Sequence, residues 1–194
     1  MSVPVADDGQ VRCGWVPTDS SPNGVLYRQY HDTEWGKRLR GTVPLFERVS
    51  LEAFQSGLSW LTILRKRDGF RHAFAGFDIE KVARFTDRDI ARLMEDAAIV
   101  RNRAKIEATI NNARAIAELD IDLSDLLWSF APPPRARPAE LSEVPAVTPE
   151  STAMAKELKR RGFRFVGPTT AYALMQATGM VDDHIASCWV PAAA

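Results

Sequence analysis

The sequence predicts an all-α protein built as one domain. In most segments, apolar residues recur at intervals of three and four, which places them along one face of a helix. No stretch alternates convincingly between apolar and polar residues, as a half-buried strand does. No internal repeat with a period of roughly 20 to 50 residues is visible. We expect the domain over residues 11–194, after a disordered tail of residues 1–10.

The composition is that of an ordinary globular protein, with 194 residues, 45% hydrophobic and 26% charged. No apolar run approaches the roughly 20 residues that a membrane helix needs. The first residues lack the basic and apolar regions of a signal peptide, so we expect a cytoplasmic protein with no membrane partner. Because 25 basic residues balance 25 acidic ones, binding to nucleic acid requires a local basic surface.

Turn and cap residues divide the chain into helices. The turn-rich segment 17–24 predicts a loop, and Pro44 suits the first turn of the next helix. Gly69 is expected to end the second helix, Asp78 to cap a later one, and Thr86 with Asp89 to form a capping box before the next. The predicted helices cover 45–56, 59–68, 70–75, 79–85, 87–94, 102–118, 123–130, 149–161 and 169–178.

Six prolines fall within residues 132–149. Proline removes a backbone donor and blocks regular structure, so we expect segment 131–149 to be a surface connection. We expect it to join two helical lobes around a cleft. The first lobe is predicted from about 45–130, and the second from 11–44 together with 148–194.

The stretch Leu51–Trp60 has apolar residues that predict burial, yet it contains one carboxylate, Glu52. Gly57 interrupts the apolar pattern, and Ser59 can cap a new helix that begins at Trp60. A buried carboxylate is costly unless a cation or a hydrogen-bond donor meets it. An acid and a large aromatic ring suit a pocket for a flat, cationic ligand. The alternative is a core helix with an exposed glutamate.

Two cysteines and two histidines form a candidate metal site. His184 and Cys188 are four residues apart, so on a helix they share one face and can bind one ion. With Cys13 and His31 they make a set that suits tetrahedral zinc. Four protein ligands leave no open position, so such an ion would be structural and would join the two ends of the chain. The rival interpretation is two unrelated buried cysteines and a polar histidine.

Segment 163–172 predicts two helices joined by a glycine hairpin. Backbone N–H groups in such a turn can point at a phosphate, and Lys159, Arg160, Arg161 and Arg164 add positive charge. The alternative is an ordinary connection with a solvated basic face.

Six motifs, in order, resemble the 3-methyladenine DNA glycosylase I family of the helix-hairpin-helix glycosylase superfamily. They span nearly the whole chain, from about residue 11 to 188. They are Cys13-Gly14-Trp15, Tyr30-His31-Asp32-x-Glu34-Trp35-Gly36, Leu51-Glu52-x-x-Gln55-x-Gly57-Leu58-Ser59-Trp60, Arg161-Gly162-Phe163-x-Phe165-Val166-Gly167, Met175-Gln176-Ala177-x-Gly179 and Asp183-His184-x-x-x-Cys188.

The resemblance implies a role for each matching residue. The family's four ligands for one structural zinc ion fall on Cys13, His31, His184 and Cys188. Its base-pocket acid, counted here as catalytic, falls on Glu52. The other implied base-binding residues are Tyr27, Tyr30, Trp60 and Trp15, and the implied DNA-binding residues are Gly57, Leu58, Arg164, Val166, Gly167 and Thr169.

The resemblance also implies an activity. A monomeric enzyme would extrude 3-methyladenine from alkylated double-stranded DNA and hydrolyse its N-glycosidic bond, leaving an abasic site and free 3-methyladenine. Thr169 stands where many helix-hairpin-helix glycosylases have a catalytic lysine, so no lyase activity is expected. Asp182 echoes the superfamily's catalytic aspartate, although a helix N-cap is an alternative role. A glycosylase of other base specificity and a non-catalytic DNA-binding module are the competing interpretations.

Overall fold

A computed structural model describes residues 7–192, and their regular structure is helical. The prediction of an all-α protein is therefore confirmed for this part of the chain. The helices are α1 (Pro22–Thr33), α2 (Thr42–Gln55), α3 (Trp60–Ala73), α4 (Ile79–Ala83), α5 (Asp87–Glu95), α6 (Arg103–Ala117), α7 (Leu123–Trp128), α8 (Pro149–Arg160) and α9 (Pro168–Ala177), with short 3-10 turns at Ala75–Phe77 and Leu141–Glu143. None of the described helices is long and apolar enough to cross a membrane.

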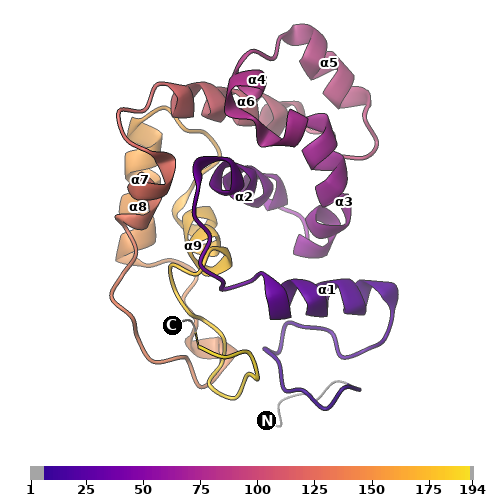
Figure 1. The fold of residues 1–194 in the computed structure, drawn as a ribbon, viewed down its shortest axis with the longest axis vertical. Helices are drawn as coiled ribbons and strands as arrows, with labels where there is room; N and C mark the ends of the chain where they lie inside the picture. Colours follow the sequence, from indigo (N-terminus) through magenta and orange to yellow (C-terminus); the bar gives the residue numbers. More distant parts are fainter. Residues whose placement is uncertain (1–6, 193–194) are drawn as a thin grey trace.

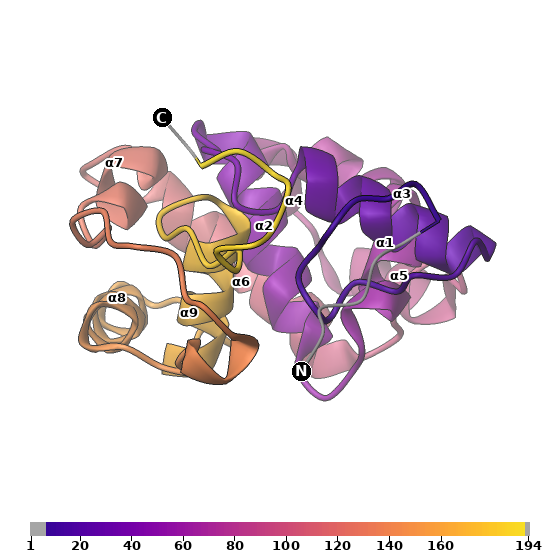
Figure 2. The ribbon, with the colours of Figure 1, turned by 90° about the horizontal axis from the view of Figure 1, so that it is seen from below.

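Helix α2 lies at the centre of the molecule. In Figures 1 and 2, α1, α3 and α5 lie on one side of it, and α7, α8 and α9 on the other. Apolar side chains from both sides form one continuous core with α2, in which Phe46 and Phe54 are fully buried. The division into two lobes stays a prediction. Helix α7, which the sequence groups with the first lobe, lies beside α8.

Several predicted caps are present. Asp78 accepts a hydrogen bond from the backbone of Lys81, and Thr86 with Asp89 forms a capping box at α5. Such caps satisfy backbone groups that have no partner inside the helix. Helix α1 begins at Pro22, capped by Ser21, so the predicted loop 17–24 is too long by three residues.

The predicted break at Gly69 was wrong, because α3 runs through it to Ala73. Position 69 has no room for a side chain because a distant part of the chain packs against it. A Cβ atom on Gly69 would lie 2.5 Å from the carbonyl oxygen of Ala98. The glycine allows the segment after α5 to pack against α3, and a single sequence gives no sign of that close approach.

The two ends of the described chain meet. The backbone N–H of Trp189 donates to the carbonyl of Val11, and the segment after α9 runs beside the segment before α1 (Figure 1). Of the predicted tail, residues 1–6 lie outside the described residues. Within its remainder, Asp7 accepts a hydrogen bond from Ser20, and Asp8 pairs with Arg12.

Candidate functional site

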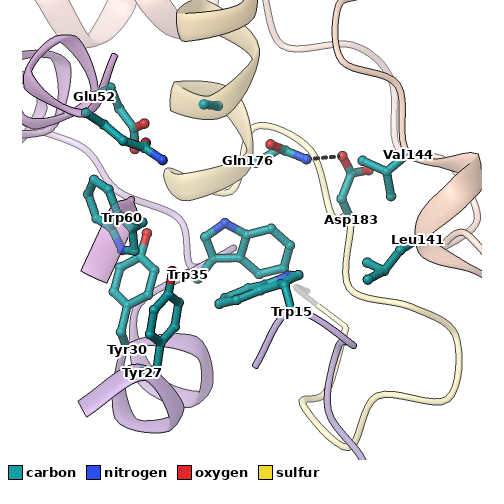
Figure 3. Close-up of a pocket in the computed structure, with 12 residues that line it drawn as sticks. Trp15, Tyr27, Tyr30, Trp35, Glu52, Trp60, Leu141, Val144, Gln176 and Asp183 are labelled. Carbon is teal, nitrogen blue, oxygen red and sulfur yellow. Dashed lines mark hydrogen bonds between the residues drawn. The ribbon is translucent and has the colours of Figure 1, made fainter. Parts of the chain in front are cut away.

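A cavity of about 270 Å³ lies between α1, α2, α3 and α9. The Pro-rich connection closes one side of it. Figure 3 shows Glu52, Trp60 and Tyr30 on one wall, and Leu141, Val144 and Asp183 across from them. The lining residues are Trp15, Tyr27, Tyr30, Trp35, Glu52, Gln55, Trp60, Leu141, Val144, Ala173, Gln176 and Asp183.

The corner between α2 and α3 brings Glu52 and Trp60 to the same cavity. Helix α2 ends at Gln55, and Gly57 turns the chain with a φ of 79°. Ser59 then caps α3 through a hydrogen bond from the backbone of Thr62, which makes Trp60 the first residue of α3. The acid and the ring therefore face one cavity, as the sequence pattern suggested.

Aromatic rings form most of the wall. The Tyr30 and Trp60 ring centroids lie 5.3 Å apart, and Trp15 contacts Tyr27 and Trp35 edge to face at 5.7 and 5.0 Å. All four aromatic residues predicted to bind a base line the cavity. The sequence did not single out Trp35 as a fifth, although it lies within one of the quoted motifs.

Arg48 supports this wall from behind. It is buried one turn before Glu52 on α2, donates a hydrogen bond to the Tyr30 hydroxyl at 3.1 Å, and lies over the Tyr30 and Trp60 rings at 5.4 and 5.5 Å. Its guanidinium also lies 3.7 Å from the Glu34 carboxylate. Arg48 was not among the predicted site residues, although a charged residue within the apolar pattern of a helix was a visible signal.

Glu52 is only 5% exposed, and no described residue donates a hydrogen bond to its carboxyl group. Burial raises its pKa to about 7, and the positive charge of Arg48 opposes that rise. A buried, unpartnered acid at this pKa ionises readily when a cationic ligand enters the cavity.

We expect the substitution Arg48→Met to raise the pKa of Glu52 above its value of about 7, because it removes the attraction that favours the carboxylate. NMR titration of the glutamate side-chain carboxyl groups measures this change. Arg67→Met is the matched control, since Arg67 also pairs with Glu34 but is not among the groups that shift the pKa of Glu52. An unchanged or lower pKa of Glu52 in the Arg48 variant would contradict the assigned role.

The structure brings together the four residues predicted to bind a metal. Their ligand atoms lie within 4.8 Å of one another, and all four residues are buried. The Cys188 Sγ atom lies 3.5 Å from His184 Nδ1 and 3.6 Å from His31 Nε2, and Cys13 Sγ lies 3.6 Å from His184 Nδ1. Zinc bonds of about 2.3 Å to sulfur and about 2.0–2.1 Å to nitrogen imply a tetrahedral S···N separation of roughly 3.5 Å. This group is therefore shaped to bind one metal ion.

The surroundings of the cluster also suit a metal. His31 pairs through Nδ1 with Asp32 at 2.8 Å, and His184 Nε2 lies 3.2 Å from the carbonyl of Trp35. Such partners on the second ring nitrogen orient histidine ligands. Hydrogen bonds from Cys13, His184 and His31 hold the pKa of the Cys188 thiol below its ordinary value.

The expected helix around His184 and Cys188 is absent, because turns follow α9 there. The backbone N–H of Cys188 bonds to the carbonyl of Ile185 in such a turn. The ligands meet through this turn and not through helical spacing. The contact between His184 and the Trp35 carbonyl links the cluster to the cavity wall.

The placement of Asp182 does not support the catalytic role that the sequence suggested. Its carboxylate pairs with Arg137 at 2.9 Å and accepts from the backbone of His184, and it does not line the cavity. The neighbouring Asp183 does line it. The two neighbouring aspartates therefore have different surroundings: Asp182 forms a partly buried ion pair with Arg137, and Asp183 lies in the cavity wall.

The predicted DNA-contacting segments are two exposed turns. In the first, Leu58 is 41% exposed. The second joins α8 to α9, and there Arg164, Gly167 and Thr169 are exposed, whereas the side chain of Val166 is buried. Any contact from Val166 would therefore come from its backbone.

The basic character of the second turn is weaker than the sequence suggests. Arg160 and Arg161 both pair with Glu157, and Arg161 also pairs with Asp120. Those pairs leave Lys156, Lys159 and Arg164 as the exposed cations around this turn for which the described residues offer no ion pair.

Comparison with known proteins agrees with this geometry. The model of the methyladenine glycosylase family matches residues 20–191. The DNA-3-methyladenine glycosylase 1 of Escherichia coli K12 is 45% identical over 91% of this chain and 95% of its own length. A crystal structure of a 3-methyladenine DNA glycosylase I superposes with a TM-score of 0.86 at 43% identity, covering 92% of this chain and 98% of that one.

A second solved structure concerns 3-methyladenine recognition by the Staphylococcus aureus 3-methyladenine DNA glycosylase I. It has a TM-score of 0.83 and 37% identity, and it covers 90% of this chain and 94% of that one. Sequence and fold thus agree over nearly the whole length. The chain belongs to the methyladenine glycosylase family.

Proposed function

We propose that this protein removes 3-methyladenine from alkylated double-stranded DNA by hydrolysing its N-glycosidic bond, which leaves an abasic site. The observation that carries the proposal is Glu52, a buried carboxyl group to which no described residue donates a hydrogen bond and which shares a cavity with the rings of Tyr30 and Trp60. A flat cation with hydrogen-bond donors complements both features. An adenine methylated at ring nitrogen 3 is such a ligand.

Recognition requires the base to leave the duplex, because nothing can surround its faces within the stack. Alkylation weakens pairing and lowers the cost of extrusion. The Trp60 ring then stacks on the cationic base, a contact of about 2 kcal/mol when desolvated. The ionised Glu52 accepts hydrogen bonds from the amino edge and compensates the positive charge.

The chemical step needs little help from the protein. The methylated base is positively charged while attached and becomes neutral as it departs, so the glycosidic bond is already weak. Water attacks the resulting oxocarbenium-like sugar. Thr169 supplies no amine, so no Schiff base forms, and the enzyme is monofunctional.

Two turns are proposed to contact the DNA. Gly57 and the exposed Leu58 fill the gap that the extruded nucleotide leaves, and the turn between α8 and α9 binds the phosphate backbone through N–H groups and Arg164. Helix α6 holds both turns in place. Lys105 donates to the carbonyls of Phe54 and Ser56, at the end of α2.

Asn112, also on α6, clamps the second turn. Its side chain accepts from the backbone N–H of Arg164 at 2.8 Å and donates to the carbonyl of the same residue at 3.1 Å. We expect Asn112→Leu to weaken binding to duplex DNA about tenfold, the effect of losing two hydrogen bonds. Fluorescence anisotropy with a methylated duplex measures this loss.

Free 3-methyladenine should bind the Asn112 variant normally, because Asn112 does not line the cavity. Asn23→Leu, on an exposed position of α1, is the matched control and should leave both affinities unchanged. Equal losses for duplex and free base would show that Asn112 supports the whole fold and not the turn in particular.

We further propose that the metal is one zinc ion with a structural role. Cys13, His31, His184 and Cys188 would hold it, and the S···N separations of 3.5 and 3.6 Å fit tetrahedral coordination. Four protein ligands leave no position for water, so the ion joins the ends of the chain and takes no part in the reaction.

Release of bases from methylated DNA, followed by chromatography, tests the proposed function. We expect 3-methyladenine as the released base and an intact strand at the abasic site. Release of 7-methylguanine or oxidised bases would point to a different specificity. Binding to DNA without release would identify a non-catalytic binding module.

A further inference from the structure

We propose that Gln176 determines specificity at the wall opposite Glu52. Its amide oxygen, held toward the cavity by Asp183, favours bases with a hydrogen-bond donor over bases with an oxo group at the same edge. This inference rests on the proposed function and adds a second recognition group to it. Both residues line the cavity but stood outside the predicted site.

Asp183 is a buried acceptor with three donors around it. Its Oδ2 atom accepts from the Tyr172 hydroxyl at 2.6 Å and from Gln176 Nε2 at 2.9 Å, and its Oδ1 atom accepts from Arg135 at 2.7 Å. The Asp183 side chain is 0% exposed, so these contacts are shielded from water. The Arg135 guanidinium can only donate, and the two Asp183 carboxylate oxygens act as the acceptors in all three of these contacts.

This environment determines the orientation of the Gln176 amide. Facing a carboxylate that only accepts, the amide must present its NH₂ group there, and a flipped amide would place oxygen against oxygen. Figure 3 shows the amide nitrogen directed at Asp183 and the oxygen away from it, on the side of Glu52. No described residue donates a hydrogen bond to that oxygen.

The cavity therefore has hydrogen-bond acceptors on two walls. Glu52 comes from α2, and Gln176 comes from α9, where Ala173 one turn earlier leaves space in front of the amide. An amino group of an adenine-type base can donate to either acceptor. An oxo group at the same edge, as in a guanine-type base, could accept no hydrogen bond from either Glu52 or the Gln176 oxygen, and would lose its hydrogen bond to water without replacement from them.

Asp183 is thus a positioning residue that acts through Gln176. A purely structural role is the alternative, since Asp183 also anchors Arg135 of the Pro-rich connection. The two roles differ in their consequences. Loss of an anchor lowers stability and the release of every base alike, whereas loss of orientation changes the ratio between bases.

The experiment compares release of 3-methyladenine and 3-methylguanine from the same methylated DNA. Gln176→Met keeps the length of the side chain but removes the acceptor, and it should lower the ratio of 3-methyladenine to 3-methylguanine release about tenfold. Asp183→Asn frees the amide to turn its NH₂ group inward and should lower the ratio by raising 3-methylguanine release. Gln29→Met, on an exposed position of α1, should leave the ratio unchanged.

An unchanged ratio in Gln176→Met would overturn the proposal, whatever happens to the melting temperature. Should Asp183→Asn fail to fold, the Gln176 variant alone decides. Calorimetry with the two free bases separates this inference from the proposed function. If the wild type releases no base, the proposed function fails. Calorimetry would still support the role of Gln176 if the wild type binds free 3-methyladenine more tightly than free 3-methylguanine and Gln176→Met abolishes this preference.

Discussion

Replacing Cys188 by alanine is expected to abolish binding of the proposed metal ion and to lower the melting temperature by roughly 8–16 °C. The Cys188 Sγ atom contacts a ring nitrogen of both histidines in the cluster, His31 and His184. An ion present at about 1,000 times its Kd stabilises the native state by about 4 kcal/mol. In a domain of this size, each kcal/mol corresponds to roughly 2–4 °C. Elemental mass spectrometry and thermal unfolding measure the two effects.

The matched control for this prediction is His72→Ala, which removes an exposed histidine outside the cluster and should keep both metal and stability. A strong chelator should destabilise the wild type by about the same amount and leave the Cys188 variant unaffected. Wild-type protein that purifies without any metal would refute the assignment of a bound zinc ion.

The sequence was most informative where local chemistry decides the structure. Caps such as Asp78 and Thr86 act within one turn, so their effect can be predicted from neighbouring residues. The four residues of the Cys/His cluster could be proposed together because few residue types bind zinc and because the family resemblance places its metal ligands on them. Their spacing was a poor guide, since turns and not a helix bring His184 and Cys188 together.

The sequence was least informative where the role of a residue depends on a distant neighbour. Gly69 looks like a helix end until Ala98 is known to pack on it. Arg160 and Arg161 look like DNA contacts until their pairing with Glu157 is seen. The same holds for cavity residues such as Gln176, whose meaning comes from a carboxylate seven residues away.

Replacing Glu52 by glutamine is expected to lower both the release of 3-methyladenine and the affinity for the free base by about 10- to 100-fold. The substitution keeps the size of the side chain but removes the charge, and a hydrogen bond to a charged group contributes about 1.5–3 kcal/mol. Single-turnover release assays measure the first effect, and calorimetry with the free base measures the second.

The pH dependence of stability provides an independent signature of Glu52. Its pKa is 4.5 in its ordinary state and about 7 in the fold. Below pH 4.5 the group is protonated in both states and costs nothing. As the pH rises from about 4.5 to about 7, the group ionises in the unfolded state but stays protonated in the fold, so the native protein loses on the order of 3 kcal/mol of stability, and above pH 7 this loss stays constant.

Glu52→Gln should therefore be more stable than the wild type at pH 8 and equal to it below pH 4.5, while its activity is lower. Glu47→Gln is the matched control on the same helix, because Glu47 pairs with Arg71 and does not line the cavity. A carboxylate buried for ligand binding should have opposite effects on stability and activity. Its negative charge destabilises the protein when the cavity is empty but stabilises a cation bound there. A variant that loses stability at pH 8 would instead make Glu52 part of the framework that holds the core together.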